Sequence, residues 1–241
     1  MILLSLISFT CTQVYKGGIW ETLLIAFTFN MPQFIQFVVI VFYYTLMLMV
    51  RAILSNMKEN CLNTIKEKKN PKYSIKIVAK KSTFSITYLE LFYVQVIEAK
   101  SDIINAFRMP IILILIQIFH AIVTIALSLY NQTILQINLS INNITISSLC
   151  LSFQALKLYA FASSGDMIQF EVTEIARALH NIPIDQNVDI MMQVQRFSTL
   201  MSYYNPIVSV YDFFPLDATL IFNVLASATT YLIIFVQFEN N

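Results

Sequence analysis

The chain has 241 residues, of which 57% are hydrophobic and only 12% charged, and its mean hydropathy is +0.68. A soluble domain carries about 25% charged residues, so this composition excludes an ordinary water-soluble core. The formal net charge of +1 indicates no general preference for acidic or basic partners. We therefore expect a membrane protein whose solvent is largely lipid.

Membrane-spanning segments are indicated by three windows without any charged residue, Thr22–Val50, Met109–Leu156 and Ala218–Phe238. A helix needs roughly 20 apolar residues to cross a bilayer. The first and third windows each hold one span, and the middle window holds one span, a polar stretch and the start of another. The predicted spans are Leu23–Val50, Pro110–Leu129, Ile146–Ser164 and Ala218–Phe238.

The apolar segment Met1–Tyr15 is too short to be a span, because its helix would cover about 22 Å of a core about 30 Å thick. It lacks the basic start and the small-residue cleavage site of a signal peptide. The segment is typical of the second half of a helix whose first half is missing.

A basic segment follows the first full span. Eight lysines and two glutamates lie between Lys58 and Lys81. Such a run can bind nucleic acid, but beside a membrane span it favours a cytoplasmic loop that obeys the positive-inside rule. We expect this loop to lie inside the cell and the chain to have no nucleic-acid partner.

The loop after the second full span carries three N-x-[ST] sequons, which begin at Asn131, Asn138 and Asn143. Glycans are added on the luminal side, so the sequons predict that this loop faces outside. Counting one crossing from the basic loop gives the same orientation. The count then places Asp166–Asp217 in the cytoplasm and the C-terminus outside, which is opposite to a G-protein-coupled receptor.

Two predicted cytoplasmic stretches have helical apolar spacing, one from Ile86 to Ile97 and one from Val172 to Leu200. Two alternatives stay open: the stretches lie flat on the inner leaflet, or they pack together and extend the spans downward. The predicted fold class is all-α, a polytopic transmembrane helix bundle with cytoplasmic helical extensions. The predicted division is into residues 1–50 with a partial and a complete membrane helix, 51–109 with the basic cytoplasmic loop and a helix, 110–165 with two membrane helices and their outer loop, 166–217 with a cytoplasmic helical segment, and 218–241 with a final, pore-type membrane helix.

Residues that carry out chemistry are scarce. The chain has only three glycines and no phosphate-binding glycine loop. Its two histidines, His120 and His180, have no carboxylate or cysteine at metal-binding spacing. The charge-free windows contain no acidic residue, which disfavours a proton-coupled transporter. We expect no enzyme activity, no cofactor and no metal site.

Lys157 is the one clear charge inside a predicted span, on a segment that also carries Gln154 and Tyr159. An intramembrane charge indicates a functional site, where it faces a polar ligand cavity or pairs with another helix. In the alternative, the span is shifted and Lys157 extends toward the inner membrane face. The second alternative is the preferred interpretation.

The last span carries a polar stripe, because Asn223, Ser227, Thr230, Ile234 and Gln237 follow one another at steps of three and four residues. Amide and hydroxyl groups in a membrane must face protein or water. They either bind neighbouring helices or, in a symmetric oligomer, line a pore for hydrated cations. The spacing alone leaves both alternatives open.

The end of this span reads TYLIIFVQF and resembles the terminal signature of insect gustatory receptors, matched at Thr230, Tyr231, Gln237 and Phe238. The motif lies in the last span, almost at the end of the chain, as it does in that family. The passage with Ile104, Asn105 and Phe107 before a span, and the segment 213–217 at the foot of the last helix, are also similar to the family's pattern.

The resemblance implies a multi-pass plasma-membrane protein with seven helices, a cytoplasmic N-terminus and an extracellular C-terminus. Such receptors are ligand-gated cation channels for small soluble tastants. They assemble in the lipid bilayer as tetramers of one or several receptor subunits around the last helix. By this resemblance Gln237 and Phe238 lie at the pore constriction, and Thr230 and Tyr231 lie in the same helix. Gln154, Lys157 and Tyr159, on the sixth family helix, are the candidate ligand contacts.

The resemblance covers family helices four to seven and the end of helix three, so we expect the chain to be a fragment of a longer receptor. Two alternative functions remain. An odorant receptor shares the topology, although the signature from Tyr231 to Gln237 disfavours it. A transporter or scaffold would use the polar stripe only to hold helices together.

Overall fold

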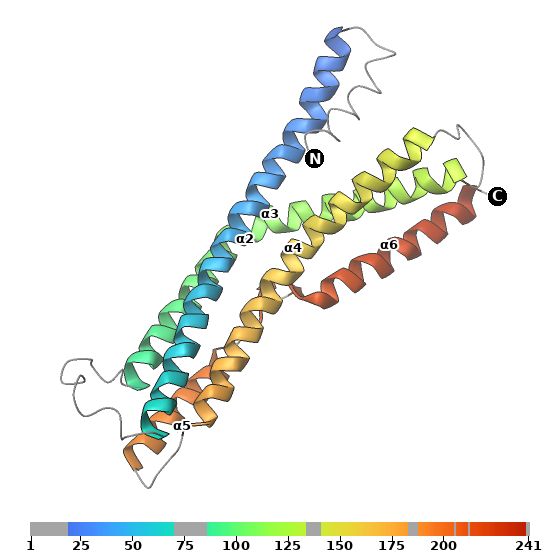
Figure 1. Cartoon of the computed structure of the whole chain (residues 1–241). Helices are drawn as coiled ribbons and strands as arrows, with labels where there is room; N and C mark the ends of the chain where they lie inside the picture. The colour runs from blue at the N-terminus through green and yellow to red at the C-terminus, as the bar shows by residue number, and fades with distance from the viewer. Residues whose placement is uncertain are drawn as a thin grey trace. The chain divides into compact units, whose positions relative to one another are not determined.

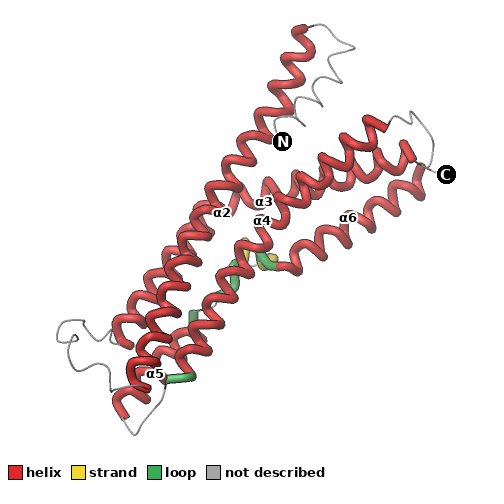
Figure 2. Tube along the Cα trace, viewed as in Figure 1, coloured by secondary structure: helices red, strands yellow, loops and turns green. Residues whose placement is uncertain are grey.

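The fold consists almost entirely of long α-helices (Figures 1 and 2). The computed structural model describes residues 19–69, 86–133, 141–182, 188–204, 206–211 and 213–239. The predictions for Met1–Tyr15, and for the lysines of the basic segment beyond residue 69, lie outside these ranges. The elements are α2 (Ile19–Lys69), α3 (Ile86–Thr133), α4 (Ile141–His180), α5 (Val188–Tyr203), β1 (Ser209–Val210), β2 (Phe214–Pro215) and α6 (Ala218–Glu239). The predicted all-α class is confirmed.

The first three helices are much longer than the spans predicted from hydropathy. They contain 51, 48 and 40 residues, whereas roughly 20 suffice to cross a bilayer. Pro110, which was expected to begin a span, instead lies inside α3, and Pro32 lies inside α2. In the described residues, four helices are long and apolar enough to cross a membrane, which supports a multi-pass membrane protein. They contain Met31–Leu62, Ile86–Gln132, Ile144–His180 and Ala218–Phe238.

The chain divides into two compact units. Unit 1 consists of residues 1–44, 108–163 and 217–241, and unit 2 consists of residues 45–107 and 164–216. Helices α2, α3 and α4 each contribute one segment to unit 1 and one to unit 2, whereas α6 belongs to unit 1 alone.

Unit 2 is a helical bundle with an apolar core. The first amphipathic stretch buries Leu89, Tyr93 and Val96, and the ring of Tyr93 meets that of Phe197 on α5 edge to face, at 5.6 Å between centroids. On α4, Ile175 is also buried. Of the two alternatives left open by the sequence, the structure therefore favours stretches that pack together. Val188, Met191 and Met192 on α5 are the exceptions, because they are exposed.

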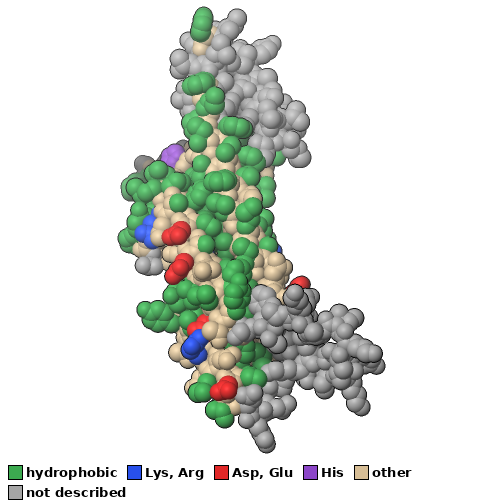
Figure 3. Space-filling model, turned by 90° about the vertical axis from the view of Figure 1, so that its left-hand side faces the viewer, with side chains coloured by type: hydrophobic (Ala, Val, Ile, Leu, Met, Phe, Trp, Pro, Cys, Tyr) green, Lys and Arg blue, Asp and Glu red, His purple; other side chains and the backbone are tan. Residues whose placement is uncertain are grey.

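Unit 1 packs fewer of its apolar side chains. Aromatic contacts join α2 to α4 through Tyr43 and Phe161, and α3 to α6 through Phe119 and Tyr231. Many large apolar side chains remain exposed, and hydrophobic groups predominate on the face drawn in Figure 3. Such a surface is unfavourable in water but favourable in lipid.

A small hairpin precedes α6, and the sequence did not predict it. β1 pairs with β2 antiparallel, with Ser209 opposite Pro215 and Val210 opposite Phe214. Tyr211 in the turn adopts a positive φ of 51°, a region that is unusual for a side chain of this size. The hairpin brings the chain to Asp217, directly before α6.

Candidate functional site

The polar stripe lies on an exposed face of α6. Its members Asn223, Ser227, Thr230, Ile234 and Gln237 are all exposed, and so is Phe238. The side that packs within unit 1 carries Leu220 and Ala228, which are buried, and Tyr231, which contacts Phe119. The stripe side chains are therefore not buried against other helices of this chain.

Helix α6 is also the least packed of the candidate spans. Only 11% of its apolar window is buried, compared with 22–33% for the other three. Phe222 and Ile233 are exposed on a third sector, outside both the stripe and the packed side. An apolar helix with one polar exposed side and one apolar exposed side has surfaces suited both to lipid and to a polar environment.

The second cluster of interest surrounds Lys157, which is only 3% exposed. Its Nζ donates hydrogen bonds to Oε1 of Gln33 at 2.6 Å and to Oε1 of Gln36 at 3.3 Å, both on α2. The same nitrogen lies 4.7 Å from the centre of the Phe153 ring, within range of a cation–π interaction. Lys157 thus pairs with another helix, as the first of the two alternatives expects, although the second was the preferred interpretation.

The structure brings together two of the three predicted ligand contacts. Gln154 is buried and lies one turn before Lys157 on the same side of α4, and its Oε1 atom has no hydrogen-bond partner among the described residues. Tyr159 is 61% exposed and is separate from this cluster. Sequence reasoning missed Gln33 and Gln36; the available signal was a pair of amides three residues apart in a charge-free window.

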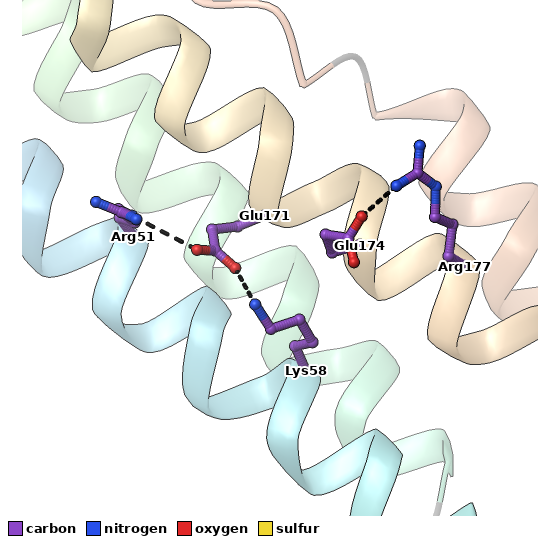
Figure 4. Close-up of polar contacts among 5 residues, drawn as sticks. All are labelled: Arg51, Lys58, Glu171, Glu174 and Arg177. Atoms are coloured by element: carbon purple, nitrogen blue, oxygen red, sulfur yellow. Dashed lines mark hydrogen bonds and ion pairs between the residues drawn. The ribbon is translucent and has the colours of Figure 1, made fainter.

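Unit 2 contains a second set of polar contacts that the sequence did not predict. Glu171 on α4 is buried, and its carboxylate lies between two cations of α2 in Figure 4: Lys58 at 2.8 Å and Arg51 at 3.5 Å. Glu174 and Arg177 form a separate pair within α4. These residues lie in different helices or at common helical spacing, so no motif marks them in the sequence.

A further ion pair joins α3 to α5. Nε of Arg196 donates a hydrogen bond to Oε2 of Glu90 at 2.9 Å, beside the contact between Tyr93 and Phe197. The carboxylate is largely buried, whereas Arg196 is largely exposed. The ion pairs of Glu171 and of Glu90 connect different helices of unit 2, so they stabilise the bundle.

Two of the three sequon asparagines fall at the ends of helices. Asn131 lies in the last turn of α3 and is half-buried. Asn143 lies in the first turn of α4, and Asn138 lies outside the described residues. In the described part of the chain, no three His, Cys, Asp or Glu side chains are grouped so that they could hold a metal ion.

These features define a polytopic helical membrane protein with a buried charge inside a candidate span and an exposed polar helix face. The chain matches the model of the 7tm Chemosensory receptor family over residues 1–241, and it belongs to this family. The membership agrees with the resemblance carried by the signature in α6. No curated protein matches the chain significantly. The family consists of receptors for small molecules rather than of enzymes.

Proposed function

We propose that the chain is part of a gustatory receptor, a subunit of a ligand-gated cation channel that detects soluble tastants at the plasma membrane. The observation that carries the proposal is the exposed stripe on α6. The hydroxyl of Thr230 already donates to the carbonyl oxygen of Ala226 at 3.0 Å within its own helix. The amides of Asn223 and Gln237 face away from their own subunit and require protein or water around them in a membrane. A path for hydrated ions between copies of α6 supplies that water.

The proposed assembly is a tetramer, of this chain alone or with other receptor subunits, in which the α6 helices surround the ion path. The small buried fraction of α6 supports it, because an apolar helix so loosely packed has surface left for further copies. In this arrangement Asn223, Ser227, Thr230, Ile234, Gln237 and Phe238 line the pore. The exposed side with Phe222 and Ile233 faces lipid or the neighbouring subunit.

The division into units supports the proposed topology. The described part of the basic segment, Lys58 to Lys69, belongs to unit 2, and the sequon residues Asn131 and Asn143 belong to unit 1. The two sequence signals for opposite sides of the membrane thus fall in different units, which supports unit 2 as the cytoplasmic part. Residues 1–50, 110–165 and 218–241 then hold the membrane helices, and 51–109 and 166–217 the cytoplasmic segments. The C-terminus is extracellular, and Asn131, Asn138 and Asn143 are the proposed glycan acceptors.

The proposed ligand-sensing residues are Gln154 and Lys157. The unsatisfied Oε1 of Gln154 supports this assignment, since a buried acceptor without a partner is costly and a ligand donor would satisfy it. Tyr159 was part of the same prediction, but its exposure on α4 supports a contact with lipid or another subunit instead.

Whole-cell recording tests the proposal in cells that express the receptor carrying this chain. We expect sucrose, fructose or caffeine to evoke a cation current that is absent from untransfected cells. Uptake of a compound without ionic current would instead indicate a transporter, and a response only to volatile odorants would indicate an odorant receptor. Either result would overturn the gustatory channel.

A further inference from the structure

Helix α4 and the hairpin before α6 approach each other unusually closely at Gly165. A Cβ atom on this residue would lie 1.7 Å from the carbonyl oxygen of Leu216 and 2.8 Å from its carbonyl carbon. Real Cβ contacts are essentially never shorter than 3.0 Å. Only glycine therefore permits the observed contact between the α4 backbone and the backbone of Leu216.

The environment of this contact is tightly packed. Leu216 is fully buried, as are Ser164 and Ile168 on the neighbouring turns of α4. Val208, which precedes β1, is also buried, and a Cβ atom added to Gly165 would lie 3.5 Å from the Cβ of Val208. Because protein interiors are close-packed, a movement of the buried Leu216 displaces its neighbours.

Leu216 is held from the hairpin side as well. Its backbone N–H donates a hydrogen bond of 2.7 Å to the carbonyl oxygen of Val208. This bond continues the pairing of β1 with β2. The backbone of Leu216 is thus fixed between a helix on one side and a hairpin on the other.

Leu216 is bonded directly to the residue that starts α6. Asp217 accepts a hydrogen bond of 2.9 Å at Oδ1 from the backbone N–H of Thr219, which is the geometry of a helix N-cap. Its carbonyl oxygen also accepts a bond from the N–H of Leu220 at 3.1 Å. A displacement of Leu216 therefore acts directly on the residue that caps α6.

We propose that Gly165 and Leu216 form a joint between α4 and the hairpin that holds the residue directly before the cap of α6, so that Gly165 is a positioning residue for channel opening. The proposal rests on the proposed function, in which α4 carries the ligand-sensing residues and α6 lines the pore. Glycine weakens a helix interior relative to alanine. Its presence in the middle of α4 is explained by the close backbone approach that it permits.

The test compares Gly165→Ala with a matched variant, Ala155→Ser, which adds one heavy atom at an exposed position of the same helix. Leu216 must withdraw by about 1.3 Å to accommodate the new methyl group in Gly165→Ala. Hydrogen–deuterium exchange of the purified receptor follows residues 216–220, with residues 194–201 of α5 as an internal reference. We expect exchange in 216–220 to become at least tenfold faster in Gly165→Ala only, with the α5 reference unchanged.

Single-channel recording then measures the functional consequence at equal surface amounts of receptor. We expect the open probability, both basal and with sucrose, fructose or caffeine, to fall at least fivefold in Gly165→Ala. The conductance of each opening should stay the same, because the pore-lining side chains are intact. A loss of conductance at constant open probability would place the defect in the pore and overturn the joint.

Unchanged exchange in residues 216–220, or unchanged open probability, would also overturn the proposal. If the unmodified receptor conducts with none of these compounds, the channel function fails instead, and the exchange experiment alone decides whether the joint exists. If Gly165→Ala does not fold, Val208→Ala takes its place with the same readouts. That variant removes packing from the hairpin side without adding an atom, and it should accelerate the same exchange.

Discussion

Lys157 carries a positive charge in the middle of α4, where burial without partners would be prohibitive. An ammonium group has three donors, and in this structure two are directed to Gln33 and Gln36 while the ring of Phe153 lies alongside. The cluster therefore satisfies its charge locally and fastens α4 to α2. It also places polar groups beside the unsatisfied oxygen of Gln154, which supports the proposed ligand-sensing site.

Replacing this lysine tests both roles at once. Lys157→Met leaves the two glutamine oxygens without their donor, so we expect the folded state to lose about 1–3 kcal/mol. Thermal unfolding followed by size-exclusion chromatography measures the loss, and the tastant-evoked current should fall as well. Tyr159→Phe is the control, because its side chain is exposed and should leave both quantities unchanged. Equal melting temperatures for the two variants would contradict the assignment.

At the scale of single elements, a few polar contacts join the long helices of unit 2 in addition to its apolar core. Glu171 joins α4 to two residues of α2 that lie two turns apart. Because the carboxylate of Glu171 is buried, breaking its ion pairs costs more folding free energy than breaking a surface pair. The exposure of Arg51 weakens one of the two pairs by solvent screening. The pair of Glu90 with Arg196 performs the same function between α3 and α5.

The two glutamates of α4 in Figure 4 allow a direct comparison. Glu171→Gln removes the shared counter-ion of Lys58 and Arg51, so we expect a loss of about 1–3 kcal/mol in unfolding free energy. Glu174→Gln removes only a surface pair with Arg177, and the expected loss is below about 0.5 kcal/mol. Urea titration of the purified protein measures both. A larger loss of unfolding free energy in Glu174→Gln than in Glu171→Gln would contradict the stabilising role of the contact between α2 and α4.

Helix α6 permits a similar comparison between its exposed sides. Gln237→Leu removes an amide from the proposed pore, so we expect the single-channel conductance to change by at least about twofold. Thr229→Val is the matched control, since the hydroxyl of Thr229 already donates to the carbonyl oxygen of Leu225 at 2.8 Å within its own helix. Equal conductance in both variants would show that the stripe does not line the ion path, and it would favour a role for the stripe as a contact between helices.

At the scale of the whole molecule, the proposed topology places the basic segment in the cytoplasm and the C-terminus outside the cell. A tag inserted after Lys76, in the basic segment, should be reached by antibodies only in permeabilised cells. A tag fused after Asn241 should be reached in intact cells, because α6 runs outward in the proposed orientation. Immunofluorescence with and without detergent makes the comparison. If the C-terminal tag is hidden in intact cells, the orientation of α6 and the pore assignment both fail.

Much of the architecture follows from the sequence through local properties. The charge-free windows predict the four helices that can cross a membrane, and the spacing from Asn223 to Gln237 predicts a stripe on one side of α6. These predictions hold because hydropathy and helical period depend on residues that are neighbours in the chain. Hydropathy did not predict how far the helices continue, because α2, α3 and α4 are extended by amphipathic segments that need a partner to be stable.

Only the tertiary structure decided which residues meet. Lys157 binds Gln33 across 124 positions of sequence, and Glu171 binds Lys58 across 113. Nothing local selects these partners, because the same charges and amides satisfy one another in many alternative packings. The approach of Leu216 to Gly165 was equally inaccessible to sequence reasoning. In the sequence, a glycine in a helix shows only that a side chain is absent. Which backbone segment approaches the glycine is decided by the fold.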